Sequence, residues 1–527
     1  MRANSWTAGL VLGAAMALSW PADAKNVLRW SSQGDALTMD PYSQNEGPTT
    51  AMGQHIYDPL IRRDAKLEMI PGLAVSWKVV DPTTWEFKLR PGVKFHDGTP
   101  FTADDVVFSL NRVKGPGSDF KSYITTVTEA KKIDDLTVHI VTSQPTPLLA
   151  ANLTSVAIMS KAWAEKHNVV KAQDYKAKEE THAVRNAMGS GPYVLKIREP
   201  DVRTVLEKNP NWWGWDNGKD APDEIVYTPV KNAATRVAAI LSGELDFLLD
   251  PPVQDIARLK AAPSLHLKET NQIRTIFLGM DQARSELRSS DVKGKNPFSD
   301  KRVRQAVYQA VDIEAIKGKV MRDNAIPAGM VTSPGVHGYT KAHDTRLKYD
   351  AEAAKKLLAD AGYPNGFSVK LDCPNDRYVN DEGICQALVP MLGRIGIKVQ
   401  LETQSKTLHF PKIQRGESDF YMLGWGVPTL DSHYVFSFLG ATATQGSSSW
   451  NFTGYSNKRL DQLSEAMDQE LDKAKRDAMI AEAWTLMNGD VPYVPLHHQV
   501  IAWAMSKKID MPIIANDSPQ LWLARFK

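Results

Sequence analysis

The chain has 527 residues, 43% of them hydrophobic and 24% charged, and its formal net charge at pH 7 is +2. A chain of this length is too long for one hydrophobic core, so we expect two or three domains. A nearly neutral charge without basic runs argues against a nucleic acid as partner.

The first 24 residues have the pattern of a secretory signal peptide. A positive charge at Arg2 precedes an apolar run over residues 7–18, and residues 22–24 (ADA) supply a small-x-small cleavage pattern. The alternative is a membrane anchor, but spanning a bilayer takes about 20 apolar residues and this run is shorter. We therefore expect export to the periplasm with cleavage after Ala24. No later segment is long and apolar enough to span a bilayer.

Residues 85–96 predict a β-hairpin followed by a helix. Apolar and polar side chains alternate over Trp85–Arg90 and again over Val93–His96, and a Pro-Gly turn separates the two runs. Thr102 is placed to cap a helix, with Asp105 at the third helical position as the second half of a capping box.

Further along the chain, helical and strand patterns alternate, which indicates an α/β or mixed α+β class. The expected elements are a helix over 232–242, a strand over 245–249, a helix over 350–361, a strand over 367–371, a helix over 382–394 and a strand over 397–402. The last three form a βαβ unit, which favours parallel pairing of its strands.

The chain contains two cysteines, Cys373 and Cys385. In an oxidising compartment we expect them to form a disulfide. A metal site is the alternative, but no matching cluster of His or Cys lies nearby in the sequence. We expect no metal and no cofactor.

Two segments carry a family resemblance. Gly72–Trp77 reads GLAVSW, and Val93–Ser109 reads VKFHDGTPFTADDVVFS. Both resemble the signature of the extracytoplasmic solute-binding proteins of the peptide and nickel family (family 5). Similar segments follow in order along nearly the whole mature chain, including GSGPY at 189–193, LSGELDF at 241–247 and PFSDKRVRQAVYQAVD at 297–312.

The resemblance implies an α/β, two-lobed periplasmic-binding-protein fold of type II, large and with an extra subdomain. Two crossing segments would join the lobes, and residues 492–503 would be the return crossing. Lobe I would comprise residues 25–272 plus 492–527, with the extra subdomain at about 63–185. Lobe II would comprise residues 273–491. Family members enclose their ligand between the lobes.

Arg377 is the first candidate ligand contact. It follows the strand over 367–371, and its planar guanidinium group matches a carboxylate with two parallel hydrogen bonds. In dipeptide-binding relatives an Arg at the end of the corresponding strand holds the peptide C-terminus, and Arg377 resembles it, with Tyr378 placed to stack alongside. The alternative is a surface Arg paired with Asp376 or Asp381.

Trp425 is the second candidate. It follows a predicted strand and lies between Gly424 and Gly426, which would let a ligand backbone approach closely. We expect Trp425 to form a pocket wall; the alternative is a core Trp beside a tight turn.

One position departs from the peptide-binding pattern. Dipeptide and oligopeptide binders have Gly-Trp-x-x-Asp, whose carboxylate binds the ligand's ammonium group, whereas the matching residue here is Pro428. Asp431 is a possible substitute, with His433 nearby. The alternative is that Asp431 caps a helix over 432–439.

Weaker signals come from the N-terminal loops. Ser32 and Asn45 lie in early loops of the kind that face the cleft in relatives. They complete the predicted ligand contacts.

The resemblance implies that the chain is the periplasmic binding component of an ABC importer. It would bind short peptides or a peptide-like solute and deliver it to permease subunits in the inner membrane, and we expect a monomer. The alternative keeps the fold and changes the ligand to haem, glutathione, a nickel chelate, an oligosaccharide or an opine. A secreted hydrolase is a remote alternative, because G-x-S-x-G and H-E-x-x-H are both absent. We therefore expect no enzymatic activity.

Overall fold

The structure is a computed structural model that describes residues 25–216, 218, 220–443, 450–470 and 472–527. The predicted signal peptide lies outside the described residues, so cleavage after Ala24 stays a prediction. Among the helices of the described part, none has the length and apolar character needed to cross a bilayer.

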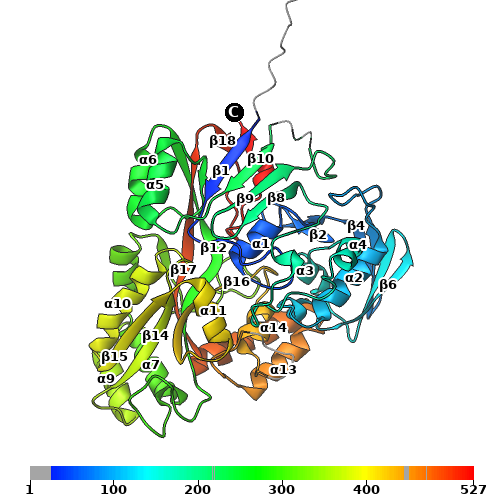
Figure 1. The fold of residues 1–527 in the computed structure, drawn as a ribbon. Helices are drawn as coiled ribbons and strands as arrows, with labels where there is room; N and C mark the ends of the chain where they lie inside the picture. The colour runs from blue at the N-terminus through cyan, green and yellow to red at the C-terminus, as the bar shows by residue number, and fades with distance from the viewer. Residues whose placement is uncertain (1–24, 217, 219, 444–449, 471) are drawn as a thin grey trace, which may run out of the picture.

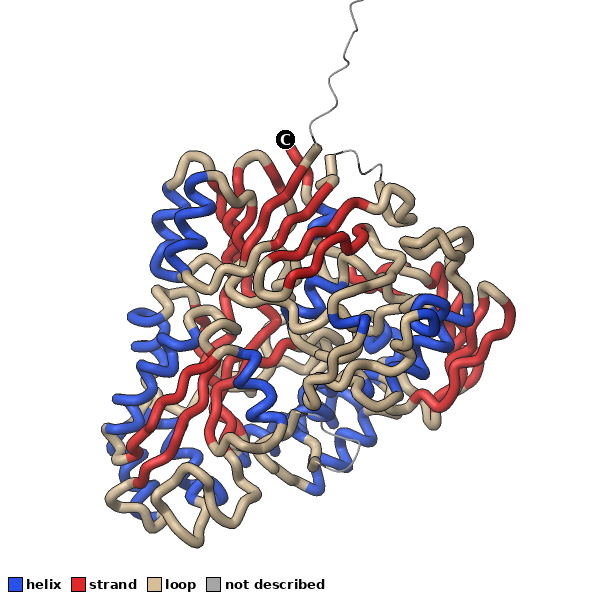
Figure 2. Tube along the Cα trace, in the orientation of Figure 1, coloured by secondary structure: helices blue, strands red, loops and turns tan. Residues whose placement is uncertain are grey.

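A large mixed sheet runs through the whole molecule (Figures 1 and 2). Its strands lie in the order β15-β14-β16-β12-β17-β11-β1-β10-β9-β8, and β13 pairs with β17. The bounds are β1 Val27–Ser31, β8 Tyr193–Glu199, β9 Arg203–Lys208, β10 Glu224–Tyr227, β11 Phe247–Leu248, β12 Leu265–Met280, β13 Ala325–Pro327, β14 Phe367–Pro374, β15 Ile397–Gln404, β16 Phe420–Gly426 and β17 Tyr493–Ser506.

The strands β12 and β17 are long and belong to both halves of this sheet. They pair antiparallel from Leu265 opposite Ser506 to Gly279 opposite Tyr493. On one side lie β11, β1, β10, β9 and β8, and on the other β16, β14 and β15. This is the two-lobed arrangement expected from the sequence, with β12 and β17 as the crossing segments. We call the half containing β1 lobe I and the half containing β14 lobe II; the predicted residue boundaries of the lobes stay a prediction.

Helices flank both lobes (Figures 1 and 2). In Figure 1, α5 and α6 lie beside the upper part of the sheet, and α7, α9 and α10 beside the lower part. The bounds are α1 Gly47–Gly53, α2 Ala103–Lys114, α3 Leu149–Leu153, α4 Lys161–Lys166, α5 Ala233–Ser242, α6 Ile256–Ala261, α7 Lys301–Ala310, α8 Ile313–Ala315, α9 Ala351–Asp360, α10 Asp381–Gly393, α11 Lys406–Gln414, α12 His433–Val435, α13 Lys458–Met467 and α14 Lys473–Asp490.

The local helix signals are confirmed. Thr102 and Asp105 form the predicted capping box at the start of α2. Asn232 caps α5, which ends at Gly243 in the left-handed conformation that glycine adopts without a steric penalty. Asp350 caps the N-terminus of α9 with its side chain, as Asn232 caps that of α5.

A separate antiparallel sheet forms within lobe I, in the order β4-β5-β7-β6, with α2 packed on it. Its strands are β4 Ala74–Asp81, β5 Thr84–Leu89, β6 Val127–Asp134 and β7 Thr137–Thr142. Two small sheets complete the fold: β2 Ile61–Arg63 with β3 Met69–Pro71, and β18 Ile509–Asp510 with β19 Arg525–Phe526.

The hairpin predicted over residues 85–96 is wrong. β5 pairs with β4 and β7, while Val93–His96 forms a tight loop in which Phe95 N–H donates to Thr99 O. Val93 and Phe95 are nevertheless buried. The alternation of apolar and polar residues here therefore arises because Val93 and Phe95 anchor a loop in the core. In the sequence, this pattern looks like that of a strand.

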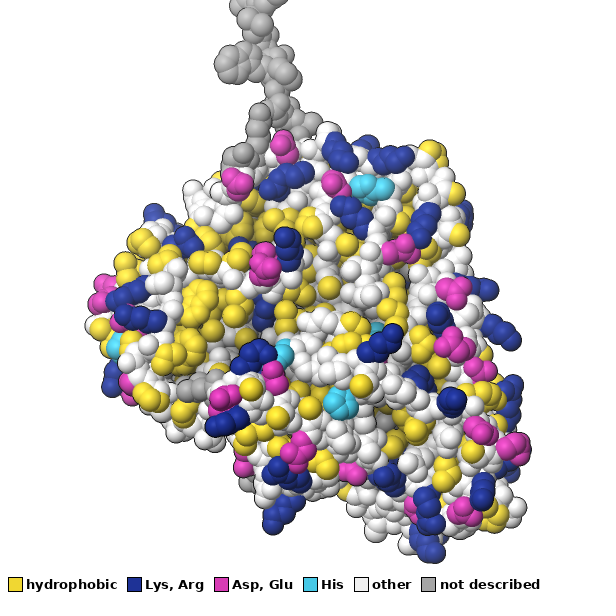
Figure 3. All heavy atoms as spheres, turned by 180° about the vertical axis from the view of Figure 1, so that it is seen from behind, with side chains coloured by type: hydrophobic (Ala, Val, Ile, Leu, Met, Phe, Trp, Pro, Cys, Tyr) yellow, Lys and Arg dark blue, Asp and Glu magenta, His cyan; other side chains and the backbone are white. Residues whose placement is uncertain are grey.

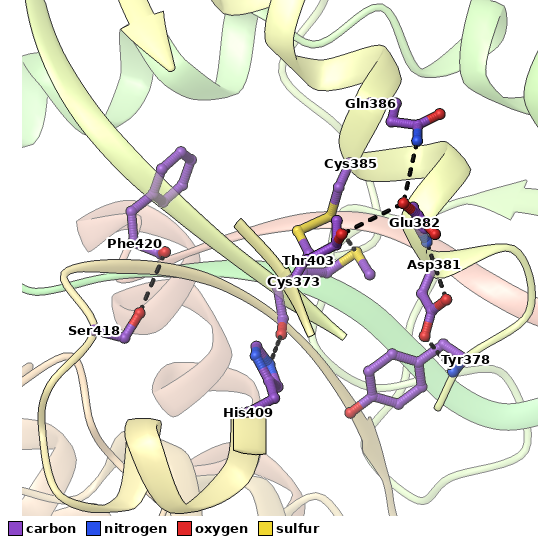
Figure 4. Close-up of a disulfide and its surroundings, with 11 residues drawn as sticks. Cys373, Tyr378, Asp381, Glu382, Cys385, Gln386, Thr403, His409, Ser418 and Phe420 are labelled. Atoms are coloured by element: carbon purple, nitrogen blue, oxygen red, sulfur yellow. Dashed lines mark hydrogen bonds between the residues drawn. A yellow bond between two sulfur atoms is a disulfide. The ribbon is translucent and has the colours of Figure 1, made fainter. Parts of the chain in front are cut away.

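The predicted βαβ unit is confirmed. β14 and β15 are parallel neighbours from Phe367 opposite Ile397 onward, and α10 connects them. The disulfide between Cys373 and Cys385 joins the end of β14 to the first turns of α10 (Figure 4).

Charged side chains are mixed over the surface. On the face seen in Figure 3, Lys and Arg are interspersed with Asp and Glu, without a stripe of one sign. This face therefore lacks the basic patch that contacts with nucleic acid require.

We predict that removing the disulfide lowers the free energy of unfolding by about 3 kcal/mol, because the crosslink restricts the unfolded chain. Its sequence separation is 12 residues. Urea unfolding of the oxidised protein and of a C373A/C385A variant measures the difference. Reductant should destabilise the native protein and leave the variant unchanged; an equal response of both would contradict the prediction.

Candidate ligand-binding site

A cavity of about 340 Å³ lies between the lobes, within the size range of small-molecule sites. Its walls come from the loops after β1, from β12, from the loop after β14, from β16 and from the C-terminal segment. Seven of the nine predicted contacts line it: Ser32, Asn45, Arg377, Tyr378, Gly424, Trp425 and Gly426. Asp431 and His433 are not among the lining residues.

The Arg377 side chain is buried and pairs across the cavity. Its Nε lies 3.0 Å from Glu46 Oε1, and the side chain is 9% exposed. Neither Asp376 nor Asp381 is the partner of the guanidinium group, so the surface pairing considered above does not occur. Asp381 instead accepts the main-chain N–H of Arg377 at 2.9 Å and thereby fixes the loop. Burial raises the pKa of the Asp381 carboxyl to about 7.

Glu46 connects the lobes. Its Oε1 also lies 3.1 Å from Lys406 Nζ, and its Oε2 accepts hydrogen bonds from Thr49 N–H and Oγ1, both at 3.0 Å. Burial opposes the charge of Glu46, but Lys406 and Arg377 outweigh this effect and hold the pKa of Glu46 below its ordinary value. Lys406 Nζ donates in addition to Asp35 O at 2.7 Å. Two cations of lobe II are thus bound to one carboxylate of lobe I.

Tyr378 and Gly424 pack closely in the cavity wall. Tyr378 Oη donates to Gly424 O at 3.3 Å, and the Arg377 guanidinium carbon lies 5.0 Å from the Tyr378 ring centroid. A Cβ at position 424 would lie 2.6 Å from Ile276 Cδ1 and 2.7 Å from the Tyr378 ring. Glycine is therefore required here by the side chains around it.

Trp425 belongs to an aromatic wall that crosses the cavity. Its ring stacks on Tyr434 at a centroid distance of 5.6 Å, and Tyr434 stacks on Tyr123 of lobe I at 5.7 Å. Asn45 Nδ2 donates to Tyr434 Oη at 3.2 Å. Trp425 lines the cavity and is also part of a hydrophobic core cluster, so the two interpretations of this residue are compatible.

Asp431 is engaged away from the cavity. Arg476 binds both its oxygens at 2.7 Å, and His337 Nδ1 lies 2.8 Å from Oδ2. Burial alone would raise the pKa of Asp431, but the hydrogen bonds from His337 and Arg476 hold it well below its ordinary value. Asp431 Oδ1 also accepts His433 N–H at the start of α12, which is the capping role considered as the alternative. His433 Nε2 lies 3.0 Å from Ser464 O.

Sequence reasoning missed several charged groups of the cavity, among them Arg274, Lys406 and Asp517. Arg274 and Asp517 line the cavity, and Lys406 binds Glu46 in its wall. The sequence contained a signal for Arg274, because it is the one charged residue in the otherwise largely apolar second half of β12, Ile273–Met280. Lys406 and Asp517 lie in polar segments and had none.

We predict that Asp431→Asn lowers the free energy of unfolding by about 3–5 kcal/mol, because it leaves the buried Arg476 without its carboxylate. Asp477→Asn is the matched control, since Asp477 binds the other nitrogen of His337 but its side chain is 40% exposed. We expect Asp477→Asn to lower the free energy of unfolding by less than about 1 kcal/mol. Urea unfolding measures both, and equal stability of the two variants would refute the structural role of Asp431.

Three comparisons place the chain among known proteins. It is 27% identical over 514 residues to the glutathione-binding protein GsiB of Escherichia coli O6:K15:H31, covering 95% of each chain. The ABC transporter-associated periplasmic binding protein DppA of Helicobacter pylori, solved with peptide STSA, matches with a TM-score of 0.82 and 23% identity over 95% of this chain and 98% of that one. AgaA of A. tumefaciens R10, solved with agropinic acid, matches with a TM-score of 0.83 and 24% identity over 95% and 99%.

The two solved structures establish the fold: this mixed α/β chain has the architecture of two-lobed periplasmic binding proteins. Residues 68–447 match the family described as bacterial extracellular solute-binding proteins, family 5 Middle. The resemblance seen in the sequence motifs is thereby confirmed, and the chain belongs to the bacterial extracellular solute-binding proteins of family 5, a family of binding proteins rather than of enzymes.

Proposed function

We propose that the protein is the periplasmic binding component of an ABC importer, and that it takes up a short peptide or a peptide-like anionic solute. The observation that carries the proposal is the cavity between the lobes, with a buried arginine in its wall. Membership of family 5 supports solute binding. The relative described as ABC transporter-associated supports the importer, and with it permease subunits of the inner membrane as partners.

Each cavity residue has a role in this proposal. Arg377 binds a carboxylate of the solute, and Tyr378 holds the guanidinium group in place. Trp425 packs on the solute, and its indole N–H, which has no acceptor among the described residues, is free to donate to it. Gly424 and Gly426 let the solute backbone approach β16. Ser32 and Asn45 contribute from lobe I.

Asp431 and His433 are not part of the proposed site. The Asp431 carboxylate is bound by Arg476, and Pro428 occupies the position where peptide binders have an Asp. A free amino group therefore has no carboxylate at that point. This favours, as second candidate, a non-peptide ligand on the same fold: glutathione, an opine, haem, a nickel chelate or an oligosaccharide.

Transport would follow from closure of the lobes on the solute. To shift a 1:99 equilibrium to 99:1, the closed form must bind the solute about 10⁴-fold more tightly than the open form. The bonds of Glu46 to Lys406 and Arg377 form between the lobes and stabilise the closed form. The closed monomer then docks on the permease and releases the solute unchanged.

Native mass spectrometry of freshly purified protein identifies a retained solute by its added mass. We expect an anionic solute of peptide-like size. Protein without added mass that also fails to bind peptides, glutathione and opines would refute the proposed function.

We predict that Arg377→Ala weakens binding of that solute by about 2–5 kcal/mol, because a buried charge-assisted contact is lost. Glu46 keeps Lys406 as partner in this variant. Arg394→Ala, an exposed position in the same lobe, is the control and should bind like wild type. Isothermal titration measures both variants, and wild-type affinity in Arg377→Ala would remove this residue from the site.

A further inference from the structure

Arg274 is a cavity-lining arginine whose guanidinium group is poorly satisfied by the protein. Its Nε lies 3.3 Å from Gln272 Oε1 and its Nη1 lies 3.5 Å from Gly424 O, both long for such bonds. In the described part of the chain, Nη2 has no acceptor, and no carboxylate oxygen lies within 4.0 Å of the group.

Arg304 shows how the same protein treats a structural arginine. Its Nε donates to Val491 O at 2.9 Å, and its Nη1 and Nη2 donate to Phe298 O and Asp490 O, both at 2.8 Å. It too has no carboxylate within 4.0 Å, but main-chain carbonyls satisfy its donors. Arg274 has no such set of carbonyls, although a charge in a cavity wall needs partners.

Arg274 and Arg377 converge on Gly47. A Cβ on Gly47 would lie 2.9 Å from Arg377 Nη2 and 3.5 Å from Arg274 Nη2. Because residue 47 is glycine, no side-chain atom occupies this point. An atom placed there would lie at hydrogen-bond distance, or slightly beyond it, from the two guanidinium groups. Burial, together with the charge of Arg377, lowers the pKa of Arg274 to about 10, so Arg274 stays charged at neutral pH.

The carboxylates around the cavity all have partners other than Arg274. Glu46 binds Arg377 but is shared with Lys406. Asp250 accepts Gln33 N–H at 2.8 Å and lies 3.5 Å from Arg236. The others are also occupied: Asp40 pairs with Arg112, Asp376 accepts Lys406 N–H, and Asp517 accepts Trp503 Nε1–H. Burial raises the pKa of Asp517 to about 7, so its charge is incomplete at neutral pH.

We propose that Arg274 and Arg377 act as a pair that binds one carboxylate of the solute beside Gly47, and that the solute class is anionic rather than zwitterionic. The proposal rests on the proposed solute-binding function and deepens it. A solute carboxylate at this point would supply the acceptor that Arg274 Nη2 lacks among the described residues. Position 428 is a proline and offers no carboxylate to a ligand ammonium group. A free amine on the solute therefore gains no partner at that position.

The test uses two small probes on protein freed of solute by unfolding and refolding. N-acetylglycine is an anion without an amine, and glycinamide is a cation without a carboxylate. At equal concentration and ionic strength, N-acetylglycine should raise the melting temperature of wild type and glycinamide should not. Arg274→Met and Gly47→Ala should each lose this difference, with affinity for N-acetylglycine reduced by about 30-fold or more.

Two controls separate binding from folding. Gly489→Ala lies in α14, outside the cavity lining, where a Cβ would meet nothing within 4 Å, and it should respond like wild type. Without probe, Arg274→Met should melt at a higher temperature than wild type, because it removes an unpaired charge beside Arg377. Arg304→Met should melt lower, because it removes the donor to four main-chain carbonyls.

The outcomes are decisive. Loss of the N-acetylglycine response in both Arg274→Met and Gly47→Ala, with the response kept in Gly489→Ala, supports the proposal. An unchanged response in Arg274→Met, no preference of wild type for the anion, or a melting temperature of Arg274→Met as low as that of Arg304→Met overturns it. If the proposal falls while native mass spectrometry still finds a retained solute, the binding function stands; if no solute is retained or bound, the function itself falls.

Discussion

The pairing of β12 with β17 is the constraint on which the rest of this molecule depends. The two strands run through both lobes, and β16 and β11 join them from opposite sides. They also form part of the cavity: β12 carries Arg274, and Gln499 of β17 donates to Gln272 at 2.6 Å. A rotation of one lobe against the other must bend these strands and therefore changes the walls of the site. The strands that join the lobes thus also supply part of the cavity wall.

Electrostatics links the contact between the lobes to the proposed site. Glu46 of lobe I binds Lys406 and Arg377 of lobe II, so the ion pairs that hold the lobes together use an arginine of the proposed site. Arg274 brings a further positive charge to the same place. An anionic solute would be stabilised most in the closed form, where both lobes supply donors and water is largely excluded. Differential affinity of this kind is what a binding protein needs in order to close.

Much of the fold could be predicted because its signals are local. Thr102 with Asp105 and Asn232 with Gly243 mark helix ends through bonds within a few residues, and the family motifs supply the architecture. The hairpin over 85–96 fails because β5 lies between β4 and β7, Thr137–Thr142, and no local pattern encodes the pairing with β7. In the site, Arg377 and Trp425 stand out beside glycines and a strand end. Asp431 could not be interpreted from sequence, since its partner Arg476 lies 45 residues away.

Small-angle X-ray scattering of solute-free and solute-loaded protein tests the central claim most directly, namely that two lobes close on a small molecule. The loaded state should have the smaller radius of gyration, and its scattering curve should match the one calculated from the structure described here. Identical curves for the two states, with loading verified by mass, would contradict lobe closure as the mechanism.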